Sequence, residues 1–266
     1  MSANVSPIGV FILAKNEEEN ISRSVGAFDG TGWPVHVLDS GSSDKTVEIV
    51  SRFSFAEVQA YTYSNHCNAY NEIVETIGAA YRFVIVLDSD MVVSRALQNE
   101  IGELLRGADQ DWRILDAVVE MYSEGVALQR ASLCPPKVFL FRTGKACFVS
   151  TGHAEKVADG VKVGRVKNKL IHDDRKSYSS YLQSQFRYAN NLVARYVEGK
   201  VSSRDKLRVR WPLLIFAVPF VSFFWRRGFM DGRAGVIYAL DRLIAEAIMY
   251  RQAVASRLHK SSAKKN

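Results

Sequence analysis

Two aspartates separated by one residue, Asp88 and Asp90, are the side chains of this sequence best suited to chemistry. They follow an apolar run, 83–87, whose length and composition predict a buried β-strand. Side chains two positions apart in an extended segment point the same way, so both carboxylates can face one cation. Mg²⁺ binds through one or two protein carboxylates, together with waters and substrate phosphates. The pattern predicts a metal–diphosphate site, although two acids after a strand also occur in ordinary solvated turns.

The elements around this pair alternate between strand and helix. Apolar runs predict strands at 8–14, 35–38, 58–61 and 83–87, and periodic patterns predict helices after 16, after 46, at 65–80 and at 94–106. This alternation predicts an α/β fold with a doubly wound, mostly parallel sheet. Ligands of such sheets bind at the carboxyl ends of the strands. The clusters Lys15-Asn16-Glu17, Asp39-Ser40-Gly41 and Asp88-Ser89-Asp90 each follow a strand, so they are expected to form one pocket.

Two common nucleotide-binding motifs are missing from the sequence. It has neither G-x-G-x-x-G nor G-x-x-x-x-G-K-[ST], which removes the main support for a dinucleotide-dependent dehydrogenase or a P-loop enzyme. The three cysteines, Cys67, Cys134 and Cys147, have no C-x-x-C spacing, and this set suits a reducing cytosol. The N-terminal apolar run 9–14 is too short for a signal peptide and is expected to be the first strand.

Positive charge is concentrated at the C-terminal end of the chain. The net charge is +7, and residues 204–266 carry 13 Lys and Arg against 4 Asp and Glu. Such asymmetry indicates an anionic partner, either nucleic acid or a membrane surface. A nucleic-acid binder is expected to place stacking aromatics among its charges. Here the aromatics lie in an uncharged block, so we expect a membrane and no nucleic acid.

That uncharged block, 211–225, has a tryptophan at each end and basic residues on both sides. As a helix it would span about 22 Å, short of a hydrocarbon core of ~30 Å. We therefore expect an interfacial or re-entrant helix on an anionic leaflet. A second apolar stripe at helical spacing covers 236–248. A homodimer interface formed by both helices is the alternative.

Six segments carry a resemblance to a known family. Residues 12–21, 38–46 and 87–90 resemble the conserved elements of family 2 glycosyltransferases, which have the nucleotide-sugar-binding GT-A fold. Residues 139–146, 170–172 and 227–235 are similar to a bacterial branch of that family. This branch adds β-linked glucose or related sugars to lipopolysaccharide core or similar glycolipids. Met91 departs from the pattern because the family often has an acidic residue there, and this leaves the donor sugar open.

The resemblance implies a cofactor and two sets of ligand-binding residues. The cofactor is Mg²⁺ or Mn²⁺, and the metal ligands are Asp88, Asp90 and His172. The residues implied for the nucleotide sugar are Ala14, Lys15, Asn16, Glu17, Asp39, Asn71, Asp88 and Ser89. For Asp39 the alternative is an Asx-turn that caps the next helix. For His172 the alternative is a purely structural histidine.

An inverting transfer needs a general base that takes the proton of the acceptor hydroxyl. The branch carries a His-Glu pair at this point of the chain. An ungapped match puts Glu155 on the glutamate and Ala154 where the histidine is expected, with His153 displaced by one position. Glu155 is therefore the predicted base, and a surface glutamate is the alternative. Asp116 and Glu120 are rival carboxylates on a predicted strand.

The predicted organisation and function follow from the resemblance. It implies a catalytic domain at 1–173, with a nucleotide-sugar half at 1–93 and an acceptor half at 94–173. A helical, membrane-associating region at 174–259 and a disordered tail at 260–266 complete the chain. The predicted enzyme moves a hexose, with inversion, from a UDP-linked donor to a lipopolysaccharide-core or lipid-linked saccharide acceptor. It would lie in the cytoplasm, on the inner face of the plasma membrane. A polyprenyl-phosphate sugar transferase, a nucleotidyltransferase and a non-enzymatic binder of anionic surfaces are the alternatives.

Overall fold

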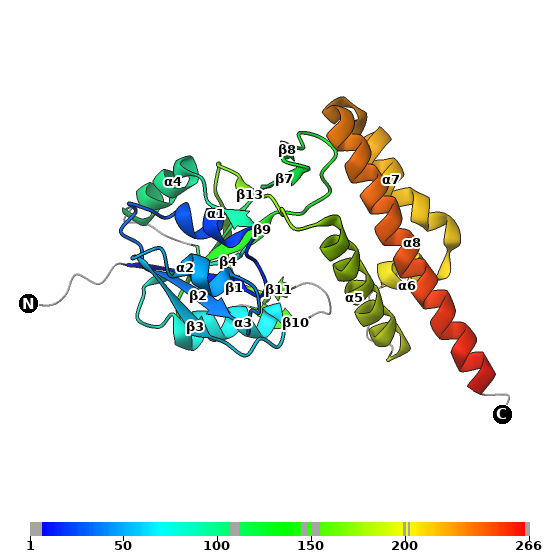
Figure 1. The fold of residues 1–266 in the computed structure, drawn as a ribbon, viewed down its shortest axis with the longest axis horizontal. Coiled ribbons are helices and arrows are strands. Elements are labelled where there is room, and N and C mark those ends of the chain that lie inside the picture. The colour runs from blue at the N-terminus through cyan, green and yellow to red at the C-terminus, as the bar shows by residue number, and fades with distance from the viewer. Residues whose placement is uncertain are drawn as a thin grey trace, which may run out of the picture. The chain divides into compact units, whose positions relative to one another are not determined.

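The structure is a computed structural model that describes residues 7–106, 112–144, 148–150, 155–198, 201 and 203–263. The chain divides into two compact units (Figure 1). Unit 1 comprises Met1–Tyr122 and Cys134–Arg175, and unit 2 comprises Ser123–Leu133 and Lys176–Asn266. The division at Arg175 lies close to the predicted one at 173. Ser123–Leu133 belongs to the helical unit, which was not predicted. The residues that this segment contacts lie about a hundred positions further along the chain.

A seven-stranded sheet forms the centre of unit 1, in the order β12-β6-β9-β4-β1-β2-β3. Its strands are β1 (Ile8–Ala14), β2 (Val35–Asp39), β3 (Ala56–Ala60), β4 (Phe83–Asp88), β6 (Ile114–Ala117), β9 (Lys137–Arg142) and β12 (Val163–Arg165). β3, β2, β1 and β4 are parallel, and β9 runs antiparallel between β4 and β6. The predicted α/β fold with a mostly parallel sheet is confirmed, and β9 is the strand that breaks the parallel order.

Apolar side chains cover both faces of this sheet, which explains the uninterrupted apolar runs of its strands. Ile8, Val10 and Ile12 pack on one face, and Phe11 packs on the other. The first face is covered by helices α1 (Ile21–Gly26) and α4 (Arg95–Arg106), and the second by α3 (His66–Glu72) with its π-helical continuation η1 (Ile73–Ile77). Each large side chain buried in this way contributes about 1.5–3 kcal/mol of transfer free energy. The sheet is therefore a rigid support for the loops at its carboxyl edge.

Short strands complete unit 1. β5 (Met91–Val92) pairs antiparallel with β13 (Leu170–His172), and β13 pairs parallel with β7 (Val119–Ser123). β10 (Phe148–Ser150) and β11 (Glu155–Val157) form a separate antiparallel pair. The pairing of β5 with β13 matters for the site because β5 begins directly after Asp90 and β13 ends at His172.

Unit 2 is helical apart from the short strand β8 (Val126–Ala127). Its helices are α5 (Tyr178–Val197), α6 (Ser203–Arg210), η2 (Pro212–Phe216), α7 (Ala217–Phe220), η3 (Val221–Trp225), η4 (Gly228–Asp231) and α8 (Gly232–Ala263). The long helix α8 packs along α5, α6 and α7. α8 continues to Ala263, whereas the sequence predicted disorder from Lys260; the run Ser-Ser-Ala contains no helix breaker. Among the described residues, no single helix has the length and apolarity to cross a membrane. Only Pro212–Trp225 and Gly228–Arg257 taken together, bent by 69°, meet that criterion.

Candidate functional site

The loops after β1 and β2 are bound to each other at the carboxyl edge of the sheet. Asn16 has a left-handed backbone, with φ of 54°, and its N–H donates to Ser42 Oγ at 2.8 Å. Its side-chain Oδ1 accepts from the N–H of Ser43 at 2.8 Å. The N–H of Glu17 donates to Thr46 Oγ1 at 2.8 Å. Because of these contacts, the acidic segment after β1 forms a loop, and the helix expected from Asn16 begins only at Ile21.

Asp39 organises the loop that follows β2. Its side chain is buried, and Oδ2 accepts from the N–H groups of Gly41 and Ser42, each at 3.0 Å. Its Oδ1 accepts from the hydroxyl of Ser42. This is the turn-forming role that the sequence offered as the alternative for Asp39. A carboxylate carries about four acceptor sites, so the turn leaves room for a hydrogen bond from a ligand.

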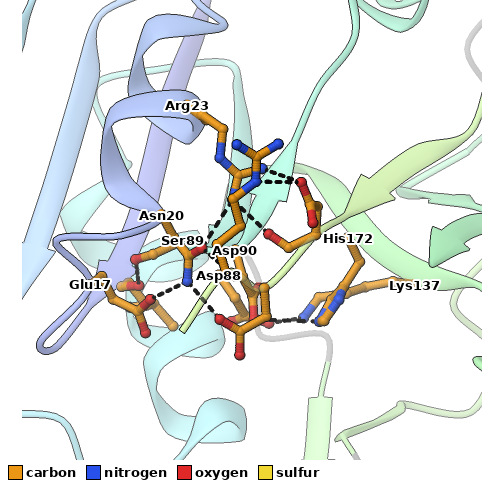
Figure 2. Close-up of polar contacts among 12 residues, drawn as sticks. Glu17, Asn20, Arg23, Asp88, Ser89, Asp90, Lys137 and His172 are labelled. Carbon is orange, nitrogen blue, oxygen red and sulfur yellow. Dashed lines mark hydrogen bonds and ion pairs between the residues drawn. The ribbon is translucent and has the colours of Figure 1, made fainter. Parts of the chain in front are cut away.

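Asp88 forms an ion pair with a lysine from the antiparallel strand β9. Lys137 Nζ donates to Asp88 Oδ2 and lies 5.8 Å from the ring centroid of Tyr70. His66 Nδ1 is 3.7 Å from Asp88 Oδ1. That Oδ1 is shielded from solvent and has no hydrogen-bond partner within the described part of the chain (Figure 2). One oxygen of Asp88 is thus paired with a cation, and the other is available to a ligand.

Asp90 faces His172, as the pairing of β5 with β13 dictates. His172 Nε2 is 3.4 Å from Asp90 Oδ2 (Figure 2). Both Asp90 Oδ1 and His172 Nδ1 are shielded and have no hydrogen-bond partner in the ranges that the structure describes. Between the two aspartates, Ser89 is buried and donates to the carbonyl of Leu13 at 2.6 Å, which ties the turn to β1. The turn is therefore rigid, and it presents two unsatisfied carboxylate oxygens.

The two aspartates have pKa values shifted in opposite directions. Burial would raise the pKa of Asp88, but Lys137, His66 and His172 together outweigh it and hold that pKa below the ordinary value. Burial raises the pKa of Asp90, the Asp88 charge adds to the rise, and His172 offsets it only in part. The pKa of Lys137 lies well above its ordinary value because the Asp88 carboxylate overcomes the effect of burial. Asp90 is therefore the carboxylate that gains most from an added cation.

A buried asparagine connects the loop after β1 to the segment after β13. Asn20 Nδ2 donates to Glu17 Oε2 at 2.9 Å and to Asp174 Oδ1 at 2.8 Å. Its Oδ1 accepts from Arg23 and from the N–H of Arg175. Arg23 in turn forms a 2.6 Å ion pair with the buried Asp173, whose N–H donates to the carbonyl of Asp90. Asn20 and Arg23 thus hold the segment that carries His172 (Figure 2).

The remaining residues predicted for the nucleotide sugar lie at different places. Ala14 is buried at the end of β1, and Lys15 and Asn16 are exposed beside it. Asn71, on α3, has both ends of its amide bonded to the backbone of Phe148, at 3.0 and 3.1 Å. That gives Asn71 a structural task, the anchoring of β10, and its role toward a nucleotide sugar stays a prediction.

The three carboxylates considered for the general base differ in their surroundings. Asp116 binds Arg165 through both oxygens, at 2.6 and 2.7 Å, and Glu120 accepts from Lys169 at 3.0 Å. Glu155 begins β11, where its backbone pairs with that of Ser150. The side chain of Glu155 lies outside the described residues, and so does the whole of His153. The prediction for Glu155 therefore stays open, while the arginine leaves Asp116 poorly placed to accept a proton.

Comparisons with known proteins give the family. The profile of Glycosyl transferase family 2 matches residues 9–155, which include the polar clusters after β1, β2 and β4. The chain belongs to this family. It is also similar to an uncharacterized glycosyltransferase of Rickettsia bellii (strain RML369-C), at 31% identity over 104 residues. That match covers 39% of this chain and 34% of the relative, so the chain spans about a third of the relative's length.

Solved structures of low identity match over longer stretches. Residues 1–349 of S. aureus TarS match at 11% identity, with 95% of this chain and 91% of that chain covered and a TM-score of 0.42. Glucosyl-3-phosphoglycerate synthase from Mycobacterium tuberculosis, in complex with Mn²⁺, UDP and glucosyl-3-phosphoglycerate, matches at 19% identity, with coverage of 71% and 79% and a TM-score of 0.42. A cytidylyltransferase from Leptospira borgpetersenii serovar Hardjo-bovis (strain JB197) matches at 13% identity, with coverage of 52% and 60% and a TM-score of 0.37.

The residues of this family 2 glycosyltransferase fit a divalent cation shared with a substrate. No group of three or more His, Cys, Asp or Glu side chains within the described residues is arranged to hold a metal ion unaided. The shielded, unpartnered oxygens of Asp88 and Asp90 supply two ligands, which is what a cation completed by substrate phosphates requires. Lys137 occupies one side of Asp88, so Asp90 is the less encumbered ligand.

Sequence reasoning missed Lys137 and Asn20. The signal for Lys137 was a single charge at the head of the apolar run 138–141, which predicts a buried cation in need of a partner. Asn20 stood inside the segment that resembles the family, but nothing in its sequence context indicates partners 154 residues away.

Proposed function

We propose that this glycosyltransferase moves a hexose, with inversion, from a UDP-linked donor to a lipopolysaccharide-core or lipid-linked saccharide. The observation that supports it most is the turn after β4. There, Asp88 and Asp90 present two shielded carboxylate oxygens that have no hydrogen-bond partner among the described residues, beside a half-buried lysine and a histidine. A nucleotide diphosphate brings the phosphates that such a pair needs to complete the coordination of a cation.

In this transfer the acceptor oxygen forms a bond to the anomeric carbon of the sugar, and the bond between that carbon and the β-phosphate oxygen breaks. The leaving group is a nucleoside diphosphate, which gains negative charge in this step. Mg²⁺ or Mn²⁺ held by Asp90 and Asp88, with His172 as a further ligand, would stabilise this charge as a Lewis acid. Lys137 contributes a fixed positive charge beside Asp88, which lowers the electrostatic cost of bringing phosphates close to two carboxylates.

The uridine part of the donor is assigned to the loops after β1 and β2. Asp39 is held in one orientation by Gly41 and Ser42, and this orientation suits hydrogen bonds from the base or the ribose. Ala14, Lys15, Asn16 and Glu17 form the adjoining wall, which hydrogen bonds from Asn16 to Ser42 and from Glu17 to Thr46 keep rigid. Ser89 supports the site through the Leu13 carbonyl and holds the two aspartates in place.

Glu155 is proposed as the general base that takes the proton from the acceptor hydroxyl. Glu155 begins β11, and the resemblance aligns it with the glutamate of the family's His-Glu pair. Asp116 is the less suitable carboxylate because Arg165 donates hydrogen bonds to both of its oxygens.

The test separates donor binding from transfer. We expect UDP to bind the full chain by calorimetry only when Mn²⁺ or Mg²⁺ is present, and Asp90→Asn to abolish this dependence. Glu155→Gln should retain UDP affinity and lose turnover of UDP-hexose in the presence of a bacterial glycolipid extract. Glu103→Gln, an exposed carboxylate on α4, is the matched control and should behave as the wild type. Metal-independent UDP binding, or normal transfer by Asp90→Asn, would contradict the proposal.

Polyprenyl phosphate is the second candidate acceptor. The exposed aromatic side chains of unit 2 between 211 and 230 favour it, since they would tolerate a lipid chain nearby. Parallel assays with polyprenyl phosphate and with lipid-linked saccharides distinguish the two acceptors. Release of pyrophosphate from a nucleoside triphosphate and a sugar phosphate would instead indicate a nucleotidyltransferase and overturn both assignments.

A further inference from the structure

Unit 2 exposes an unusual number of large apolar side chains in one short stretch. Between 211 and 230, nine of them are exposed, and Trp225 reaches 80% and Leu213 75%. The other seven are Trp211, Phe216, Phe220, Val221, Phe224, Phe229 and Met230. The stretch is helical from Pro212 to Trp225, and its inner side packs on α8. An apolar surface of this kind on a helix marks an interaction site.

Three arginines lie directly beside this apolar surface. Arg130, Arg226 and Arg227, together with Gln129 and Trp225, line a shallow hollow of about 470 Å³. All three arginines are exposed, and none of them forms an ion pair within the described part of the chain. Guanidinium groups bind phosphate through two parallel hydrogen bonds, so unpaired arginines in a hollow suit a phosphate group.

The hollow is held in shape by a clamp between two distant segments. The carboxylate of Asp231 accepts from the N–H groups of Gln129, Arg130 and Ala131, at 3.2, 2.9 and 2.7 Å. The buried Ser222 donates to the carbonyl of Ala131 at 2.8 Å. The carboxylate of Asp231 thus fixes the backbone of the loop, and the three arginine side chains form no ion pair with any residue that the structure describes.

Close backbone packing completes the clamp. A side chain at Gly228 would meet the Ser222 carbonyl at 2.6 Å and the Ala131 Cβ at 2.9 Å. Arg227, the residue before it, has a left-handed backbone with φ of 59°, which turns the chain sharply after Trp225. Arg226 Nε also donates to the carbonyl of Arg130 at 3.2 Å. The arginines therefore form a built site rather than three unrelated surface residues.

We propose that this face of unit 2 docks on an anionic lipid bilayer. The aromatic side chains between 211 and 230 enter the boundary between headgroups and acyl chains, and the Arg130–Arg226–Arg227 hollow takes the phosphate of an anionic headgroup. Charge complementarity identifies the occupant, because cytoplasmic leaflets combine negative charge with apolar depth. A second copy of this chain would bring the same arginines face to face. A nucleic acid would leave the uncharged block 211–225 without a partner.

The arginine part of the proposal is tested by sedimentation of the full chain with vesicles. Vesicles of phosphatidylcholine with phosphatidylglycerol should bind the wild type, and vesicles of phosphatidylcholine alone should bind it much more weakly. Arg226→Gln with Arg227→Gln should reduce binding by about thirtyfold, because each basic residue near an anionic surface contributes roughly fivefold. The matched control, Arg187→Gln with Arg251→Gln, removes the same charge from exposed positions on α5 and α8. This control variant should bind the vesicles less than about threefold more weakly than the wild type.

The apolar part needs a separate measurement. Brominated lipids should quench the fluorescence of Trp225 in bound protein, and Trp225→Phe should remove that component of the quenching. If Arg226→Gln with Arg227→Gln weakens vesicle binding no more than the control pair does, the proposal is overturned. The absence of quenching in the bound state would overturn it as well. Binding of inorganic phosphate without any binding to vesicles would overturn it too. These readouts use neither donor nor metal, so the proposal stands or fails independently of the transfer reaction.

Discussion

The acidic turn of unit 1 and the arginine hollow of unit 2 both gather like charges, but they stabilise them in different ways. Asp88 and Asp90 are half-buried, and each has a basic neighbour within 4 Å. Arg130, Arg226 and Arg227 are exposed and have no ion-pair partner in the ranges that the structure describes. An unpaired charge has a high free energy when it is buried, whereas water stabilises it when it is exposed. The first arrangement suits a small ligand that replaces water completely, and the second suits a large anionic surface.

The largest effect should come from the aspartate with the raised pKa. Asp90→Ala removes a shielded oxygen from the proposed donor site and should lower sugar transfer by at least about a hundredfold. Vesicle binding of the same variant should equal that of the wild type. Loss of both properties in Asp90→Ala would mean that the two regions are not independent, and the comparison would fail.

Removal of Lys137 should affect stability more than removal of an exposed lysine. Lys137→Met leaves the Asp88 charge without its partner and should lower the free energy of unfolding by about 2 kcal/mol. Lys169→Met breaks the more exposed pair with Glu120 and should cost less than about 1 kcal/mol. Denaturant unfolding of both variants gives the two values. Equal losses of unfolding free energy in the two variants would show that Lys137 does not stabilise the charge of Asp88 more than Lys169 stabilises that of Glu120.

Ionic strength should affect vesicle binding more than UDP affinity, and this difference is smaller than the effect of Asp90→Ala. Between low and physiological salt we expect vesicle binding to fall by about tenfold, because exposed arginines are screened. UDP affinity in the presence of Mn²⁺ should change by less than about threefold, since the aspartates are shielded from solvent. Calorimetry and vesicle sedimentation over one salt series measure both. A steeper salt dependence for UDP than for vesicles would reverse the assignment.

The smallest effect is an opposite response of the two units to pH. The pKa of Asp88 is lowered, so its contribution to stability is present above the unfolded pKa and is lost as the pH falls through the folded one. In unit 2, burial raises the pKa of Asp241 on α8, although a hydrogen bond from Tyr178 opposes the rise. Its contribution is present at low pH and is lost as the pH rises through the folded pKa.

Asp90 in unit 1 has a raised pKa and acts in the opposite direction to Asp88, but Asp44, Glu57 and Glu100 of the same unit also have lowered pKa values. Acidification from neutral pH toward 3.8, the ordinary aspartate value, should therefore weaken unit 1 relative to unit 2. Hydrogen exchange resolved by unit measures this difference. Asp241→Asn should raise the neutral-pH melting temperature of unit 2 by about 1 °C, since it removes a half-buried charge and keeps an acceptor for Tyr178. A lower melting temperature would show that the charge itself stabilises α8.

Sequence reasoning predicted the parts of the fold that depend on local pattern. The four parallel strands and the polar clusters that follow them were visible as apolar runs with polar ends, and the structure brings those clusters to one edge. The pairing of β9 with β4 was not visible, because strand pairing over more than fifty residues leaves no local pattern. That pairing places Lys137 beside Asp88, so the lysine was missed for the same reason.

The site residues show the same limit. His172 was expected near the metal site by resemblance, and the structure places it 3.4 Å from Asp90 through the register of β5 with β13. Nothing in the sequence gives that register, since both strands are only two or three residues long. Asn71 and Ser89 were assigned to the ligand, and these roles stay predictions; the structure shows in addition that each side chain is hydrogen-bonded to a backbone segment. Polar residues beside a site often serve its framework, and spacing does not distinguish the two roles.

The clamp in unit 2 has a consequence for recognising this surface in other proteins. Gly228 and Gly235 lie where backbones touch, since a Cβ at position 235 would come within 1.9 Å of the Gly228 carbonyl oxygen. Gly232 has φ of 61°, and Asp231 is the residue whose carboxylate binds the partner loop. A search should therefore be keyed to the spacing Gly-x-x-Asp-Gly-x-x-Gly. The glycine and aspartate positions of this spacing are set by atomic contact, whereas Arg130, Arg226 and Arg227 are exposed beside it.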